Sequence, residues 1–264
     1  MISFPVFLIN LDDSPGRLAT AQDHLASHGV SAVRIPGYNG RTLDPTTVPE
    51  YDGAATLRYM GRALNGGEIG CYFSHVRALR AFLDSEAEYG LVLEDDMLPK
   101  ADAFALTQAL IDWQATRGAP DWYVANIGAN RMKIMSKLDV LECGHTHTTI
   151  YRGHYFPMLA TSLLWTRAGA QAFVDSCLPI DCPLDNATRR WLTHNDMGLT
   201  LSPPLFTTTG AASDIDTSHT AEKRGTEGRV DGYGRLKAKR MYGDKLRALR
   251  HKVRFVLRSR SKAS

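Results

Sequence analysis

Apolar residues recur along the chain at two spacings, and the stretch from Gly66 to Met97 contains both. Its first half repeats apolar residues every three or four positions, which predicts a helix with one buried face. Gly90 ends this pattern, and the uninterrupted apolar run 91–93 predicts a short strand covered on both faces. Three carboxylates follow directly after that strand: Glu94, Asp95 and Asp96.

The same patterning predicts an α/β fold from the N-terminus onward. Residues 4–11 are an apolar run of strand length, 15–29 carry a helical stripe, and 31–35 predict a second strand. This β-α-β opening is typical of nucleotide-binding folds with a mostly parallel sheet. Further helices and strands are predicted at 101–113, 122–127, 158–165, 167–177, 199–206 and after Asp185.

Two stretches have no clear periodicity. Residues 37–65 are rich in Gly, Pro, Asp and Thr and predict a long loop, and residues 129–153 are polar and irregular. His145 and His147 have the spacing of a metal pair on a strand, but we interpret them as surface residues because no further ligand is nearby. The proline pair in the strand 199–206 favours an edge position.

Charge is the informative part of the composition. The chain has 264 residues, a net charge of +3 and 44% hydrophobic residues, enough for a folded core. Of its 31 basic residues, 12 lie between Arg235 and Lys262 together with one acid, Asp244. The remaining 19 basic and 27 acidic residues give the rest of the chain a net charge of −8.

The sequence also sets expectations about compartment. No run approaches the roughly 18 apolar residues of a membrane-spanning helix, and the N-terminus has no signal-peptide pattern, so we expect neither. The four cysteines contain no Cys-x-x-Cys pair, which favours a reduced, cytosolic chain over a disulfide framework.

The basic C-terminal segment repeats apolar residues at helical spacing: Leu246, Leu249, Val253 and Val256. A basic amphipathic helix of this kind commonly lies on an anionic membrane surface. Nucleic acid is the alternative partner, although no aromatic interleaving or known motif supports it, and a solvated tail is a third interpretation. We predict a domain over 1–221, a flexible linker over 222–235 and a basic amphipathic tail over 236–264.

The acidic triplet is the first candidate for chemistry. In open α/β sheets, ligands bind outside the carboxyl ends of the strands. Three adjacent carboxylates repel one another unless a cation or a proton compensates them, and hard oxygen ligands suit Mg²⁺ or Mn²⁺. We interpret Glu94 to Asp96 as a divalent-metal site for a phosphorylated ligand, the alternative being a solvated acidic turn. Arg17, in the first turn of the helix at 15–29, would face an anion bound there.

Three motifs, in this order, resemble glycosyltransferase family 25: INLDDSPGR at 9–17, GEIGCYFSHVRAL at 67–79 and LVLEDD at 91–96. This family includes bacterial lipooligosaccharide galactosyltransferases and collagen galactosyltransferase domains. The resemblance is continuous across residues 4–97 and goes on to about residue 215 with weaker motifs. It implies a GT-A (Rossmann-like) fold, a nucleotide-sugar donor, a divalent metal, and inversion at the anomeric carbon.

The resemblance assigns metal and donor roles to the acidic motif. Asp96 matches the direct metal ligand, and Glu94 or Asp95 would reach the ribose or a metal-bound water. Glu94 is also a candidate metal ligand. GT-A enzymes often add a late histidine to the metal shell, and His219 is placed for that role, although an exposed loop histidine is an equal interpretation.

Other matched positions lie near the donor. Asn10 and Arg17 match the first-strand motif, so the resemblance places them near the nucleotide. Ser74 and His75 match the Ser-His pair and are counted with the donor-binding residues. His75 alone at the edge of an apolar stripe also fits a hydrogen-bonded structural residue.

An inverting transferase needs a general base within hydrogen-bond reach of the acceptor hydroxyl. The family has an aspartate near the segment that contains Asp181 and Asp185, and Asp185 fits this position better. We therefore predict Asp185 as the general base, the alternative being that it caps the helix that follows it.

Together these observations predict an inverting, Mn²⁺- or Mg²⁺-dependent transferase that moves a hexose from UDP-galactose or UDP-glucose. The expected acceptor is a bacterial lipopolysaccharide, lipooligosaccharide or related surface glycan, reached at the inner face of the plasma membrane, with no nucleic acid involved. One alternative is a metal-dependent phosphodiesterase or nucleotidyl transferase that uses the same acidic cluster. Another is a non-catalytic protein that binds membrane or nucleic acid through its basic tail.

Overall fold

The computed structural model describes residues 2–210 and 228–261. Eight strands form one sheet in the order β2-β1-β3-β8-β5-β9-β7-β6. Their bounds are β1 Val6–Asn10, β2 Val33–Pro36, β3 Tyr89–Glu94, β5 Val124–Asn126, β6 Ser136–Cys143, β7 Thr146–Arg152, β8 Ser162–Thr166 and β9 Gly198–Ser202. A second, two-stranded sheet pairs β4 (Met97–Pro99) with β10 (Phe206–Thr208).

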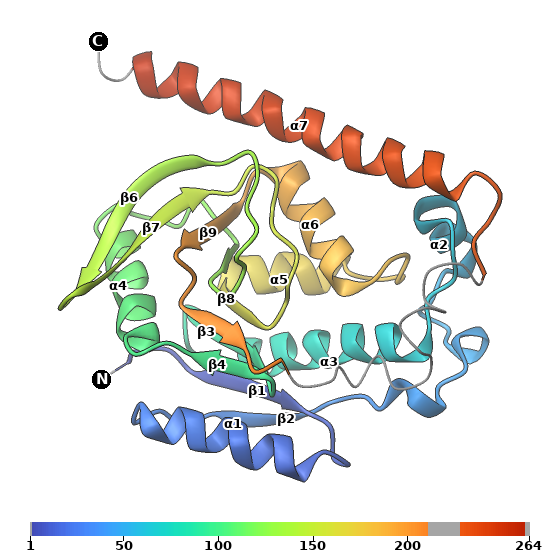
Figure 1. Cartoon of the computed structure of the whole chain (residues 1–264), viewed down its shortest axis with the longest axis horizontal. Coiled ribbons are helices and arrows are strands. Elements are labelled where there is room, and N and C mark those ends of the chain that lie inside the picture. The colour runs from blue at the N-terminus through green and yellow to red at the C-terminus, as the bar shows by residue number, and fades with distance from the viewer. Residues whose placement is uncertain (1, 211–227, 262–264) are drawn as a thin grey trace.

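Helices cover both faces of the large sheet (Figure 1). Those in the described residues are α1 Pro15–Ser27, α2 Gly53–Met60, α3 Gly66–Leu83, α4 Ala103–Ala115, α5 Arg167–Ser176, α6 Leu184–Asn195 and α7 Tyr233–Ser261. None of these described helices combines the length and the apolar character that crossing a membrane requires.

The sheet is mixed, and six of its eight strands run in the same direction. β2, β1 and β3 pair in parallel, as do β5 and β9. β8 runs antiparallel between β3 and β5, and β7 runs antiparallel between β9 and β6. The carboxyl ends of β1 and β3 therefore lie side by side, with Ile9 opposite Glu94. The expectation of a mixed, mostly parallel α/β sheet with flanking helices is confirmed.

β3 is the centre of this arrangement because both of its faces are covered. Val92 belongs to the apolar cluster shared with α3, α5 and α6, whereas Leu91 and Leu93 belong to the cluster shared with α1 and α4. Successive strand residues point to opposite faces, so a strand buried on both sides needs apolar residues at every position. This is why the run 91–93 shows no alternation, and the predicted helix and strand are both confirmed.

The stretch 37–65 is more regular than the predicted long loop. It contains two short 3₁₀ turns (Gly40–Thr42 and Pro45–Thr47) and the helix α2. Asp52 caps α2 by accepting a hydrogen bond from the Ala55 N–H, and Gly61 ends it with a positive φ of 75°. A helix of eight residues spans about two turns, too few for its periodicity to stand out from the surrounding Gly and Pro.

The stretch 129–153 was also wrongly predicted as irregular, because most of it forms the β6–β7 hairpin. β6 lies at the edge of the sheet and few of its side chains are buried, so its hydrophobic alternation is weak. His145 lies in the turn, His147 lies opposite Glu142, and both histidines are exposed.

The strand predicted at 199–206 is not at an edge. β9 ends at Ser202 and lies between β5 and β7 inside the sheet. Pro203 and Pro204 come after its last residue, so neither occupies a position where the backbone N–H must pair with a neighbouring strand.

The predicted C-terminal helix is confirmed, and it begins earlier than predicted, at Tyr233. Residues 222–227 of the expected linker lie outside the described residues.

Two glycines let the first turns of α3 pack directly on the backbone of the loop after β2. A Cβ on Gly70 would lie 2.6 Å from the Tyr38 carbonyl oxygen, and one on Gly66 would lie 2.2 Å from the Gly40 carbonyl oxygen. Real Cβ atoms do not approach so closely, so only glycine fits unless the loop moves. Gly70 of the GEIGC motif and Gly66, the residue before the motif, therefore set the position of α3 against residues 38–40.

We predict that Gly70→Ala will destabilise the protein by roughly 1–3 kcal/mol, because the added methyl group must displace the Tyr38 backbone. Gly243→Ala in α7 is the matched control, since its Cβ would meet nothing within 4 Å. In the control variant, the free energy of unfolding should rise by about 0.5–1 kcal/mol, because alanine has a higher helix propensity than glycine. Urea unfolding of both variants checks the prediction, and equal effects on the two would contradict it.

Candidate active site

A pocket lies at the carboxyl ends of β1 and β3, closed on its other sides by α3 and the loop after β2. It brings together seven of the residues that the sequence singles out: Asn10, Arg17, Ser74, His75, Glu94, Asp95 and Asp96. Sequence analysis missed Tyr38, Arg41 and Cys71, which also line it. His219, the candidate late metal ligand, lies outside the described residues.

Asp95 is compensated by side chains from β1 and α1. Asn10 Nδ2 donates a hydrogen bond to Asp95 Oδ2 at 2.7 Å, and the Arg17 guanidinium donates to Oδ1 in an ion pair. Only 8% of Asp95 is exposed, so the carboxylate needs this pairing to remain charged inside the protein. Asn10 and Arg17, which were predicted to lie near the nucleotide, thus both bind Asp95 in this structure.

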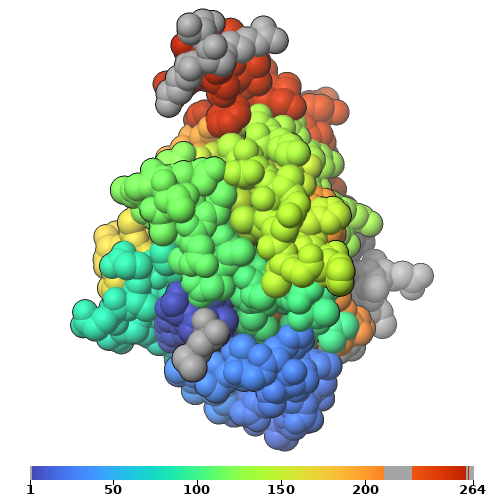
Figure 2. Space-filling view, turned by 90° about the vertical axis from the view of Figure 1, so that its left-hand side faces the viewer, coloured from blue at the N-terminus to red at the C-terminus, as the bar shows by residue number. Residues whose placement is uncertain are grey.

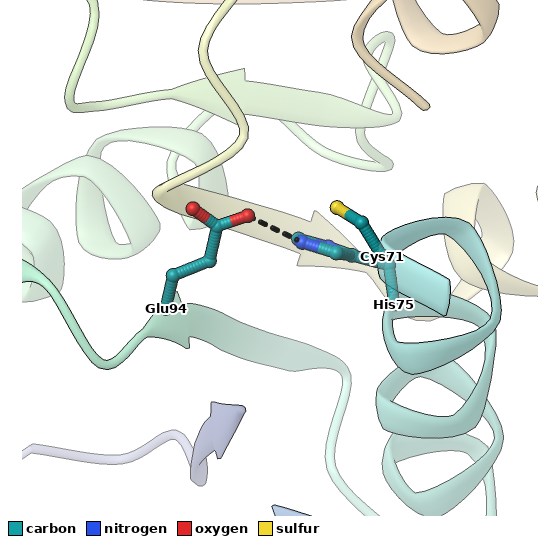
Figure 3. Close-up of side chains that lie close together, drawn as sticks. All are labelled: Cys71, His75 and Glu94. Atoms are coloured by element: carbon teal, nitrogen blue, oxygen red, sulfur yellow. Dashed lines mark hydrogen bonds and ion pairs between the residues drawn. The ribbon is translucent and has the colours of Figure 1, made fainter. Parts of the chain in front are cut away.

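Glu94 is compensated from the opposite side. His75 Nε2 lies 3.0 Å from Glu94 Oε1, and the Thr161 hydroxyl donates to Oε2 at 3.4 Å. Figure 3 shows His75 pointing from α3 toward Glu94 at the end of β3. Burial acts to raise the pKa of Glu94, but the hydrogen bond and charge of His75, aided by Thr161 and Arg17, hold it below its usual value. Glu94 is therefore an ionised carboxylate with its partners in place.

Asp96 differs from its two neighbours. Its Oδ1 atom is buried and has no hydrogen-bond partner within residues 2–210 and 228–261. Burial first, and then the charges of Glu94 and Asp95, raise the pKa of Asp96 to about 6. A buried carboxylate oxygen without a partner, next to two ionised acids, fits a divalent cation as its missing partner.

Cys71 lies one helical turn before His75, and Cys71, His75 and Glu94 have ligand atoms within 4.8 Å of one another (Figure 3). Burial, with smaller contributions from Glu94 and Asp185, raises the pKa of the Cys71 thiol well above its usual value. Metal binding requires the thiolate, so this environment opposes a thiolate-bound metal at the cluster. The spacing of four between Cys71 and His75 is the sequence signal that could have indicated their proximity.

Ser74 uses both hydrogen-bonding capacities of its hydroxyl within the protein. The hydroxyl oxygen accepts a hydrogen bond from the Tyr38 N–H at 2.8 Å, and the O–H donates to the Gly70 carbonyl at 2.7 Å. It therefore ties the loop after β2 to α3, beside the glycine contacts described above. A direct contact with the donor stays a prediction.

Asp185 lies in the first turn of α6 and lines a second pocket together with Leu159 and Arg189. Burial first, and then the charge of Glu94, raise the pKa of Asp185 to about 6. Its carboxyl group thus lies within electrostatic reach of the first pocket. Leu159 has a φ of 103°, a conformation that residues other than glycine rarely adopt and that is concentrated at functional sites.

The structure also separates Asp185 from Asp181. Both carboxylate oxygens of Asp181 accept hydrogen bonds from Arg190 at 2.7 Å, and Asp181 lines a different pocket. Asp181 is therefore held in a structural ion pair, which leaves Asp185 as the aspartate of this segment that faces the candidate active site.

Comparison with known proteins shows the family of the chain. The model of the family described as "Glycosyltransferase family 25 (LPS biosynthesis protein)" matches residues 4–187. The chain belongs to glycosyltransferase family 25, which confirms the resemblance carried by the three motifs. The mixed α/β architecture agrees with the GT-A fold that the resemblance implied.

Individual relatives match over parts of their length. A glycosyltransferase 25 family member of Drosophila melanogaster is 24% identical over 260 residues, covering 89% of this chain and 41% of the relative. Human procollagen galactosyltransferase 2 is 34% identical over 137 residues, covering 49% of this chain and 21% of the relative. The chain thus spans between about a fifth and two fifths of the length of these curated relatives.

A solved structure is also similar: a glycosyltransferase involved in the glycosylation of the major capsid of PBCV-1. It is 8% identical, with a TM-score of 0.41, and the match covers 80% of this chain and 94% of that chain.

We predict opposite effects for two neighbouring substitutions when stability is measured in EDTA. Asp96→Asn removes an uncompensated charge, so it should raise the free energy of unfolding at pH 7.5 by on the order of 1 kcal/mol. Asp95→Asn breaks the pairing with Arg17 and Asn10, so it should lower stability by roughly 1–3 kcal/mol.

The pH dependence gives the Asp96 prediction a second check. Its folded pKa of about 6 lies above the unfolded value of about 3.9, so ionised Asp96 destabilises the fold above pH 6. The advantage of Asp96→Asn should therefore be full above about pH 6 and disappear as the pH falls toward 4. Denaturant unfolding across this range measures it, and a stabilisation that persists at pH 4 would contradict the assignment.

Proposed function

We propose that this chain is an inverting glycosyltransferase that moves a hexose from a UDP-sugar to a hydroxyl group of a surface glycan. Family membership supports the reaction class, and the name of its human relative supports galactose, with glucose as the second candidate. The family description refers to LPS biosynthesis, which supports a bacterial lipopolysaccharide or lipooligosaccharide as the acceptor.

One observation carries this proposal. Of the three acids that follow β3, Glu94 and Asp95 have partners in the protein, while Asp96 has a buried oxygen without one in the described part of the chain. An Mn²⁺ or Mg²⁺ ion held by Asp96 would supply the positive charge that a diphosphate leaving group requires. Asp96, supported by Glu94, is therefore the residue we assign to the metal.

The protein side chains then have distinct roles in the reaction. Asn10 and Arg17 hold Asp95 at the mouth of the pocket, and His75 holds Glu94 in its ionised form. Because these pairings fix the backbone after β3, they also orient Asp96. His219 is proposed as a further metal ligand on the strength of the resemblance alone.

Asp185 is the proposed general base. As the acceptor oxygen forms its bond to the anomeric carbon, Asp185 takes the hydroxyl proton, and the bond from that carbon to the diphosphate breaks to release UDP. A pKa of about 6 leaves Asp185 ionised at neutral pH yet basic enough to accept a proton. Its place in the second pocket, within electrostatic reach of Glu94 in the first, supports a position between donor and acceptor.

The alternative of a phosphodiesterase or nucleotidyl transferase is less well supported. Such enzymes commonly use two metal ions about 4 Å apart, which need several carboxylates free to ligate. Within the described residues of the pocket, the bonds to His75 and Arg17 already engage Glu94 and Asp95. Family membership favours sugar transfer as well.

We predict that a UDP-hexose raises the melting temperature only when Mn²⁺ or Mg²⁺ is present. At a hundred times its dissociation constant, a ligand stabilises the folded state by about 2.7 kcal/mol. Asp96→Ala should abolish the shift, and Asp23→Ala, on the exposed side of α1, should keep it. Thermal unfolding with UDP-, GDP-, CMP- and dTDP-sugars, in metal or EDTA, measures this. A shift that survives in EDTA, or in Asp96→Ala, would contradict the metal assignment.

A second prediction concerns the base. Asp185→Asn should lower kcat by about 10²- to 10⁴-fold while the UDP-sugar thermal shift remains. In the unmodified protein, kcat should rise with pH at or somewhat below about 6 and then level off, because the base must be ionised to accept the proton and a bound cation lowers its pKa. Asp181→Asn is the comparison variant and should leave this pH profile in place. An unchanged kcat in Asp185→Asn, or a profile that moves only in Asp181→Asn, would assign the base elsewhere.

A further inference from the structure

The C-terminal helix α7 crosses one end of the molecule (Figures 1 and 2). It packs against α2 and α6 (Figure 1). Its contacts with the body are mostly polar. Arg240 Nη1 donates to the Tyr59 carbonyl at 2.7 Å, and Asp244 lies 3.5 Å from His194. Ala248 is fully buried on this face of the helix. Phe255 extends the contact by packing on the ring of buried His154.

The exposed large apolar side chains of α7 are on the other side. At 100° per residue, they are centred almost opposite the residues that contact the body. They recur at intervals of three and four residues over about 22 Å of helix. Their exposed fractions are Tyr242 64%, Leu246 52%, Leu249 48%, Val253 57%, Val256 38% and Leu257 60%.

This concentration sets α7 apart from the rest of the surface. In the described residues, the other exposed large apolar side chains are dispersed over several elements: Val33, Tyr38, Leu57, Met158 and Leu178. Scattered apolar residues are normal on a protein surface, whereas a continuous exposed stripe marks an interaction site. The sequence pattern predicted an amphipathic helix, and the structure adds that most of its apolar stripe faces away from the body, while Val256 at one border lines a pocket with Met135 and Lys137.

The charged residues around this stripe indicate which kind of partner it binds. Lys245 and Lys252 lie along one border of it, and Lys239 and Arg250 lie along the other, as the helical spacing requires. The one acid of α7, Asp244, is turned toward His194 of the body. The exposed side of α7 thus combines an apolar centre with basic borders. A second copy of the helix would bring like charges together, and nucleic acid would leave the apolar centre unmatched.

We propose that α7 binds an anionic membrane surface, independently of the reaction assigned above. The apolar stripe would lie at the boundary between headgroups and acyl chains, and the lysine and arginine side chains on its borders would reach the anionic headgroups. The helix axis lies in the plane of the membrane, because the stripe runs along its length. The anionic cytoplasmic leaflet is the surface that this charge pattern fits.

Binding of the full chain to vesicles tests this proposal. The protein should sediment with vesicles of phosphatidylcholine and phosphatidylserine, and much less with phosphatidylcholine alone. Binding should weaken at high salt, because the basic borders act through screened charge. Equal binding to both kinds of vesicle, or to neither, would overturn the proposal.

Two matched variants isolate the stripe. Leu246→Ser with Val253→Ser should lower vesicle binding at least about tenfold, because both side chains would lose their apolar contact with lipid. Leu57→Ser with Val33→Ser makes the same two changes at exposed positions of α2 and β2, and binding should be unchanged. Circular dichroism and the UDP-sugar thermal shift report whether each variant is folded, so a failure here is distinct from failure of the proposed reaction.

A variant without two of the lysines tests the role of charge, and two further measurements test the alternative partners. Lys245→Gln with Lys252→Gln should lower binding to anionic vesicles roughly thirtyfold and leave the weak binding to neutral vesicles as it is. Sedimentation velocity that shows a dimer lost in the Leu246 and Val253 variant would assign the stripe to a second copy instead. Binding to RNA that depends on these lysines but not on Leu246 and Val253, without vesicle binding, would assign the charge to nucleic acid.

Discussion

The mutual repulsion of three consecutive carboxylates at the end of β3 is the constraint on which the rest of the site depends. This repulsion is compensated in a different way at each of the three acids. Asp95 is paired by Asn10 and Arg17, and Glu94 is paired by His75 and Thr161, while Asp96 has a buried oxygen without a partner in the described residues. The partners come from β1, α1, α3 and the residue before β8. The pairing of these carboxylates therefore holds most of the elements around the pocket in place.

Close packing makes these pairings possible. α3 brings His75 within 3.0 Å of Glu94 only because Gly66 and Gly70 allow its first turns to touch the backbone of the loop after β2. Ser74 adds a hydrogen bond from the Tyr38 N–H to the same contact. The GEIGC-x-x-SH motif and the glycine before it therefore form a single packing unit, in which the two glycines, the serine and the histidine depend on one another.

Electrostatics also connects the two pockets. The ionised Glu94 is a cause of the raised pKa of both Asp96 and Asp185, so a cation bound near Asp96 would lower both values together. Binding of the proposed metal would thereby increase the fraction of Asp185 that is ionised. This coupling gives a physical reason for the proposed base to become active when the proposed metal is in place.

The sequence by itself determined the elements whose signal is local. The helix at 66–83, the doubly covered strand before Glu94, the β-α-β opening and the C-terminal helix all follow from short-range periodicity, and the acidic triplet is visible as consecutive residues. Tertiary structure alone decided the rest. It placed β9 inside the sheet, paired Asp95 with Arg17 across 78 positions, and distinguished Asp185 from Asp181. It also decided that the apolar stripe of α7 faces solvent, since periodicity identifies a face but only packing determines what covers it.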